Sequence, residues 1–322
     1  MIILQVLQTH IDLNCYNNNK CEEVEGLMLL SLIAYLSILL FVGISVYKAY
    51  KFATMPLHGR MELYPVPKEK GFEHGGSFYE EVSWWSKPHE VSHVREITEM
   101  LKEILFIKKL FENQRPLWWI SYALHLGIYF LMAWTVLLVV GAASELNGIT
   151  VAANSTSLWG LLIYYLSVLT GIFGLALGTL GAAALFLRRV FDNTLKKYTT
   201  PQEYFNLLLL FAALFTGLLT WCSDLSFHTA REVTANLISF TPFAANGLVT
   251  LHIILVGIML IYIPISKMSH YVGKYFTFHK VLWDNDPNLR GSAIEHQVKK
   301  ASTFRPTTSW SASHIKPPDV PQ

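Results

Sequence analysis

The chain has 322 residues, of which 52% are hydrophobic and only 15% charged. Soluble domains carry about 25% charged residues on average, so this composition excludes a disordered chain and a nucleic-acid-binding protein. It also argues against an ordinary soluble enzyme. The net charge of +2 is too small to indicate a class of partner.

Five apolar segments are each long enough for the roughly 20 residues that a membrane-spanning helix needs. In chain order they cover residues 27–47, 117–142, 157–187, 205–223 and 247–266. The sequence therefore predicts an all-α membrane protein with five transmembrane helices.

Lysine and arginine lie mostly on one side of these spans. The segments 48–116, 188–204 and 267–322 together hold 23 of the 25 basic residues, and only Lys20 and Arg231 fall elsewhere. Basic residues collect on the cytoplasmic side of membrane proteins. We therefore expect a multi-pass protein of the cell membrane with its N-terminus outside and its C-terminus in the cytoplasm.

The predicted organisation has three parts. They are an outer segment 1–26, a five-helix domain 27–267 with an inner insertion 50–116, and a cytoplasmic tail 268–322. Within the insertion, Glu90–Glu112 has helical spacing of its apolar residues, which fits an amphipathic helix on the membrane surface or a docking surface for a cytoplasmic subunit. The tail shows no periodicity and is too poor in apolar residues to fold alone, so we expect it to lie along a partner.

Three of the twelve histidines fall on the spans. His125 and His252 lie inside apolar segments, and His270 closes the last one. Ionisable side chains at membrane depth face the bundle interior and usually serve function. His252 and His270 are 18 residues apart, five whole turns of helix, so we expect both to project from one face of the last span, roughly 27 Å apart along its axis.

Two coordinating positions near opposite membrane surfaces suit a protein with two b-type haems, whose iron takes axial imidazoles. The Cys-x-x-Cys-His motif of covalently attached haem is absent from the sequence. Two other interpretations remain open at this point. The histidines could hydrogen-bond neighbouring helices as structural residues, or they could form a proton relay in a non-haem membrane anchor or transporter.

Several segments resemble the respiratory nitrate reductase gamma subunit family. The segment His252–His270 is similar to that family's last span in its His-x17-His spacing and its Pro-x-Ser-Lys turn. Residues 123–128, 187–200 and 217–220 resemble the same family in the same order, and the likeness covers about 115–275. The resemblance implies a five-span membrane cytochrome b with two haems that exchanges electrons with a quinone pool.

The long insertion and tail look like the DsrM branch, the cytochrome b of the dissimilatory sulfite reductase-associated complex and of related menaquinol-oxidising enzymes. That resemblance implies menaquinol as the substrate near the outer face and a link to sulfite reduction. It also implies a cytoplasmic iron–sulfur subunit of the heterodisulfide reductase type, with further membrane and outer-face cytochrome subunits. The chain has only three cysteines, too few for a cluster with four thiolate ligands. The alternative within the family is a nitrate reductase gamma-type quinol-oxidising cytochrome b.

By the pairing of the family, His125 and His270 would bind the inner haem and His252 the outer haem. The family's fourth histidine lies ten residues after the first, where this chain has Thr135. Two residues are candidates for the missing ligand. Met132 lies seven residues after His125, on nearly the same helical face, and His228 lies in the outer loop; an open sixth position is the third alternative.

Overall fold

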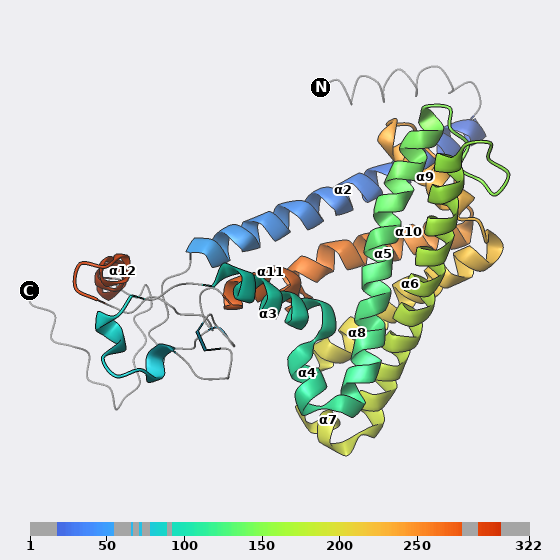
Figure 1. The fold of residues 1–322 in the computed structure, drawn as a ribbon. Coiled ribbons are helices and arrows are strands. Elements are labelled where there is room, and N and C mark those ends of the chain that lie inside the picture. The colour runs from blue at the N-terminus through green and yellow to red at the C-terminus, as the bar shows by residue number, and fades with distance from the viewer. Residues whose placement is uncertain are drawn as a thin grey trace, which may run out of the picture. The chain divides into compact units, whose positions relative to one another are not determined.

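The computed structural model describes residues 18–54, 66, 71–72, 78–88, 92–278 and 289–303, and these residues form helices without strands. The five longest helices are α2 Asn18–Thr54, α5 Arg115–Leu146, α6 Leu158–Phe191, α8 Pro201–Ser223 and α10 Gly247–Ile265 (Figure 1). Each contains an apolar stretch long enough to cross a membrane. The prediction of an all-α, multi-pass membrane protein with five spans is confirmed.

The chain divides into two compact units. Unit 1 comprises residues 1–49 and 102–272 and holds the spans, and unit 2 comprises residues 50–101 and 273–322. The insertion and the C-terminal tail, which the sequence suggested as separate segments, thus contribute to the same unit.

Within unit 1, α5 and α6 pack along most of their length, and glycines set how closely they approach. A Cβ placed on Gly127 of α5 would lie 2.4 Å from the backbone nitrogen of Gly178 on α6, and one on Gly181 would lie 2.5 Å from the nitrogen of Leu124. Small residues allow transmembrane helices to come this close and to gain dispersion contacts.

The remaining helices of unit 1 extend this pair. Helix α8 packs against α6, α10 packs against α8, and the short helix α9 His228–Ile238 packs against α5. Helix α2 crosses α10 at Gly257, where an added Cβ would lie 2.8 Å from the hydroxyl oxygen of Ser37. The buried core of this unit consists of Leu124, Ala182, Leu185, Leu207 and Leu214.

The last span is not a continuous helix up to His270. Helix α10 ends at Ile265, one residue after Pro264, and Ser266 takes an extended conformation with ψ of −177°. A 3-10 turn, η3 Lys267–Ser269, follows, and His270 begins α11 His270–Thr277. The expectation that His252 and His270 lie five whole turns apart on one face of the last span is therefore wrong, because a proline inside a helix removes a backbone donor and favours a break.

The predicted helical segment of the insertion is confirmed, and the tail is more helical than its sequence suggested. The pattern at Glu90–Glu112 gives two helices, α3 His93–Phe106 and α4 Lys108–Asn113, separated by Ile107 with φ of +50°. In the tail, α12 Ala293–Ser302 begins at Ser292, whose hydroxyl accepts a hydrogen bond from the backbone N–H of Glu295. The small core of unit 2 consists of Val66, Phe278 and Met100. The first 17 residues and the segment 304–322 lie outside the described residues.

Candidate functional site

Unit 1 brings His125 and His270 together, although 145 positions separate them in the sequence. His125 projects from α5, and His270 is the first residue of α11. Their ring centroids lie 6.2 Å apart and their ring planes make an angle of 58°. The pairing of these two histidines, which the family resemblance implied, is thus present in the geometry.

Each of these histidines has its Nδ1 atom next to a backbone carbonyl oxygen. His125 Nδ1 is 2.7 Å from the oxygen of Ser121, and His270 Nδ1 is 3.4 Å from that of Lys267. Because a carbonyl oxygen only accepts, both Nδ1 atoms carry the hydrogen, and Nε2 is the nitrogen with a lone pair for a metal. Metal-binding histidines commonly have this arrangement, which fixes the tautomer and orients the ring.

The separation of the two rings fits one metal ion between them. A metal–imidazole bond is roughly 2 Å long and each ring nitrogen lies roughly 1 Å from its ring centre, so opposite imidazoles on one ion have centres roughly 6 Å apart. Among the described residues, no cluster of three or more His, Cys, Asp or Glu side chains could hold a metal ion. A haem needs no such cluster, because its porphyrin supplies four nitrogens and the protein only the axial ligands. The residues present therefore fit an axially bound haem.

Helix α8 holds the turn before His270 from one side. Tyr262, near the end of α10, donates a hydrogen bond of 2.8 Å to Oδ1 of Asn206, a buried residue of α8. The Lys267 ammonium lies 3.7 Å from Glu203 Oε1 at the start of α8. These contacts limit how far the end of the last span can move relative to α8.

His252 lies on α10 and is the third histidine of interest. Its Nδ1 is 3.1 Å from Thr216 Oγ1 on α8, and that hydroxyl donates its own hydrogen to the carbonyl oxygens of Ala212 and Ala213 at 2.9 and 3.0 Å. Thr216 must therefore accept from Nδ1 of His252, which again leaves Nε2 as the coordinating nitrogen. A Cβ on Gly217 would lie 2.9 Å from the Cε1 atom of the His252 ring, so the ring requires a glycine there.

Among the described residues, no second imidazole faces His252. Thr135 donates its hydroxyl to the carbonyl oxygen of Leu131 in its own helix. Met132 is 64% exposed on α5, and His228 is exposed at the first position of α9. The assignment of Met132 or His228 as the partner of His252 stays a prediction.

A cavity of about 170 Å³ borders His252 between α2, α9 and α10. Its walls are apolar apart from His252 and Ser37, and they consist of Ala34, Ser37, Ile38, Val233, Leu237, Phe243, His252, Ile253, Val256, Gly257 and Leu260. The cavity therefore offers an apolar space beside the third histidine.

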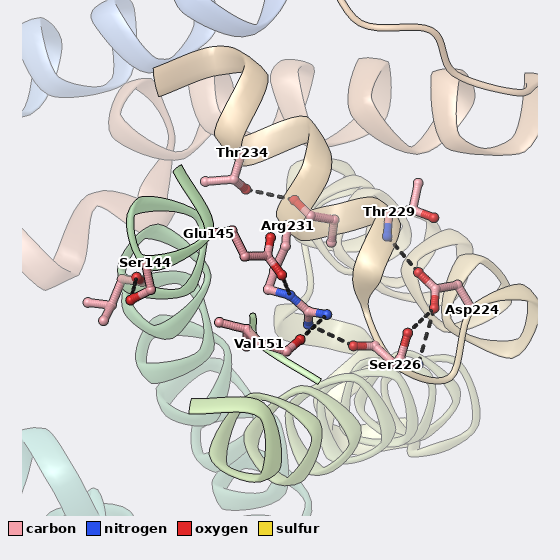
Figure 2. Close-up of polar contacts among 10 residues, drawn as sticks. Ser144, Glu145, Val151, Asp224, Ser226, Thr229, Arg231 and Thr234 are labelled. Carbon is pink, nitrogen blue, oxygen red and sulfur yellow. Dashed lines mark hydrogen bonds and ion pairs between the residues drawn. The ribbon is translucent and has the colours of Figure 1, made fainter. Parts of the chain in front are cut away.

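A buried arginine lies at the end of the bundle where α9 packs against α5 (Figure 2). Arg231 is 1% exposed, and its Nε lies 3.3 Å from Oε1 of Glu145. Its Nη1 donates to the carbonyl oxygen of Ser226 at 2.8 Å and its Nη2 to that of Val151 at 3.1 Å. One side chain thus joins α9, the end of α5 and the loop that follows α5.

Asp224 fixes the first turn of α9 in the same view (Figure 2). Its carboxylate accepts hydrogen bonds from the Ser226 hydroxyl at 2.6 Å and from the Thr229 backbone N–H at 2.7 Å. Burial by itself would raise the pKa of Asp224, but these hydrogen bonds outweigh it and hold the pKa below its usual value. The carboxylate is therefore ionised at neutral pH and stabilises the start of α9.

Comparison with family models, with curated proteins and with solved structures finds no match to this chain. The functional argument therefore rests on the geometry of the histidines. Sequence reasoning missed the residues that orient them, above all Thr216 and the carbonyl oxygen of Ser121. The glycine beside the His252 ring, Gly217, was part of a motif that the sequence did indicate.

Proposed function

We propose that this chain is the di-haem membrane cytochrome b subunit of a respiratory complex, passing electrons between menaquinol at the outer face and a cytoplasmic iron–sulfur subunit. The observation that carries the proposal is the pair His125 and His270, two imidazoles from different helices whose centroids lie 6.2 Å apart. Buried structural histidines need hydrogen-bond partners, but they do not need to face each other at the spacing of two axial ligands.

The protein's own residues would hold and orient the inner haem. His125 and His270 would bind its iron, and the carbonyl oxygens of Ser121 and Lys267 keep the hydrogen of each ring on Nδ1. A carbonyl partner of this kind also makes the coordinating nitrogen more basic. The one-electron chemistry belongs to the haem itself, and the chain supplies its position and surroundings.

Near the start of α10, His252 would bind the outer haem. Its second ligand would be Met132 or His228, or the sixth position would be open. Thr216 orients the His252 ring, and Gly217 leaves room for it. The apolar cavity beside His252 supports the presence of a quinol near this haem, since it opens space for an apolar ring system between α2, α9 and α10.

The finer parts of the proposal rest on the sequence. The excess of basic residues supports a cytoplasmic location for the insertion and the tail. The family resemblance supports a partner of the heterodisulfide reductase type, further membrane and outer-face cytochrome subunits, and a link to sulfite reduction. With three cysteines, the chain relies on that partner for the iron–sulfur clusters.

The decisive experiment is pyridine haemochrome quantitation with reduced-minus-oxidised spectra on the purified full chain. We expect b-type bands and two haems per chain, both reduced by a menaquinol analogue. A purified, folded chain without b-type absorbance would overturn the proposal and favour a non-haem anchor or a transporter with a histidine proton relay. If the chain binds haem but the menaquinol analogue does not reduce it, only the proposed quinol oxidation is overturned.

The partner is tested separately by deleting residues 279–322 from the tail. We expect the shortened chain to keep both haems and to lose co-purification with a co-expressed iron–sulfur subunit of the heterodisulfide reductase type. Co-purification that survives the deletion would show that the tail is not the docking segment.

A further inference from the structure

The direction of the His270 ring is not set by a continuous helix. Helix α10 ends at Ile265, Ser266 is extended, and only the short turn η3 leads to His270. A backbone that leaves the regular helical hydrogen-bond pattern has more freedom to rotate a side chain. The contacts made by the neighbours of His270 therefore decide how its ring faces His125.

The residue before His270 is held by a lysine of α2. Lys48 Nζ donates a hydrogen bond of 2.9 Å to Ser269 Oγ. The Ser269 hydroxyl, which is 9% exposed, donates its own hydrogen to the carbonyl oxygen of Ser266 at 2.9 Å. A chain of two hydrogen bonds thus joins the α2 ammonium to the point where the last span is interrupted.

The residue after His270 is held by a serine of the same helix. Ser45 Oγ lies 2.6 Å from the carbonyl oxygen of Phe41 and 2.5 Å from the hydroxyl of Tyr271. Because the Ser45 hydrogen points to that carbonyl, Tyr271 donates to Ser45. The Tyr271 ring also stacks on Phe41, with centroids 6.0 Å apart and planes 21° apart.

Ser45 and Lys48 are three positions apart on α2, so they lie on one face of that helix. Through this face, α2 contacts both sequence neighbours of His270. Helix α8 restrains the same turn through Lys267 and Glu203. The turn that carries His270 is therefore held between two spans.

We propose that Ser45 and Lys48 are positioning residues of the inner iron site. They form a clamp that fixes the angle of the His270 ring relative to His125, and the Lys48 ammonium raises the reduction potential of the metal bound there. This inference rests on the proposed function, because it needs an iron between the two rings. It assigns a role to α2, a span that contributes no ligand to the iron.

The two residues of the clamp act on different observables. Loss of the Ser45 contact releases Tyr271 and lets the ring angle of 58° change. In a bis-imidazole ferric haem that angle determines the g values of the electron paramagnetic resonance spectrum. Loss of the Lys48 charge removes a cation that is bonded to the residue before His270, and a cation close to a metal favours its reduced, less positive state.

The experiment compares variants of the purified haem-loaded full chain by redox titration and electron paramagnetic resonance. We expect Ser45→Ala to shift the largest g value of the inner haem, and Lys48→Met to lower its midpoint potential. The outer haem should be unchanged in both. Two matched variants on the same helix serve as controls. Ser31→Ala removes a hydroxyl that donates to Leu27 of α2, and Lys51→Met removes an exposed lysine.

Conservative variants separate positioning from general destabilisation. Lys48→Arg should keep the potential, and Ser45→Thr should keep the g values, because each retains the required charge or hydroxyl. Unchanged spectra and potentials in Ser45→Ala and Lys48→Met, in a chain that binds both haems, would overturn the clamp and leave the proposed function standing. Equal shifts in the control variants would also overturn it. A wild-type chain without haem would overturn both proposals.

Discussion

The two ends of the last span differ in how completely the fold prepares them for a metal. At one end, His125 and His270 face each other at 6.2 Å, and each has its Nδ1 next to a backbone carbonyl oxygen. At the other end, His252 has its Nδ1 fixed by Thr216 but has no second imidazole opposite it among the described residues. The first end brings two imidazoles together, and the second holds one.

The difference follows from which segments the polar side chains bind at each end of the bundle. Around His270, Lys48, Ser45 and Lys267 all restrain the turn that carries the ligand. Near the end where α9 packs on α5, Arg231 instead binds Glu145 and the carbonyl oxygens of Ser226 and Val151, which holds the loop after α5. Two histidines are therefore held together at one end, whereas at the other end only His252 is held, and its proposed second ligand stays a prediction.

The largest expected effect tests this comparison directly. We expect His125→Ala and His270→Ala each to remove the same haem, reducing the content from two haems per chain to one, since one axial imidazole binds far more weakly than two. His252→Ala should remove the other haem. Pyridine haemochrome quantitation and redox titration of each variant identify the haem that is lost. If His125→Ala abolished the same haem as His252→Ala, the pairing would be wrong.

The second effect concerns the buried arginine. Glu145→Leu would leave the Arg231 guanidinium, 1% exposed, without its carboxylate, and uncompensated buried charges of this kind cost roughly 3 kcal/mol or more. We expect a lower unfolding temperature in detergent, with the inner haem retained in the fraction that stays folded.

The matched control is the double variant Arg231→Met with Glu145→Leu, which removes both charges. It should be more stable than Glu145→Leu alone, because no buried charge is left unpaired. A double variant that is less stable than Glu145→Leu would mean that the hydrogen bonds from Arg231 to Ser226 and Val151 matter more than the ion pair.

The third effect concerns the contact between α5 and α6. Gly127→Ala would place a Cβ 2.4 Å from the Gly178 nitrogen, and since backbone cannot move aside as a side chain can, we expect a loss of roughly 2 kcal/mol. Gly43→Ala on α2 is the control, because no atom lies within 4 Å of a Cβ at that position. It should be neutral or slightly stabilising, since alanine favours helix by about 1 kcal/mol over glycine. Equal destabilisation by both variants would argue against close packing at Gly127.

These results also show what the sequence could and could not provide. Hydropathy alone predicted the five spans, because a membrane allows few alternatives to an apolar helix. The break at Ser266 falls on the Pro-x-Ser-Lys turn of the family resemblance, but the predicted spacing of His252 and His270 assumed a regular helix across that turn. The orienting contacts of Thr216 and Lys48 join residues far apart in the chain, and no local pattern marks such pairs.

The C-terminal tail illustrates a second limit. The tail reads as polar and without periodicity, yet α12 forms there because Ser292 caps its first turn and Glu295 accepts from the Gly291 N–H. Capping of this kind depends on one or two side chains. An average over composition does not register it.

The smallest expected effect concerns the missing ligand of the outer site. To reach His252, His228 would have to leave the first turn of α9, whose neighbour Phe227 is buried and whose next residue Thr229 is bonded to Asp224. Depth favours Met132, because it lies seven residues after His125, about two turns towards the outer face on nearly the same side of α5. We therefore expect Met132→Leu, which nearly conserves volume, to lower the potential of the outer haem and to remove its sulfur-to-iron charge-transfer band. His228→Ala should leave the spectrum unchanged.

The opposite result would show that the start of α9 unwinds to bind iron. In that case Met132→Leu is silent, and His228→Ala removes the outer haem or converts it to high spin. If neither variant changes the spectrum, the sixth position is open, and the outer site differs from the inner one in ligand number as well as in ligand type.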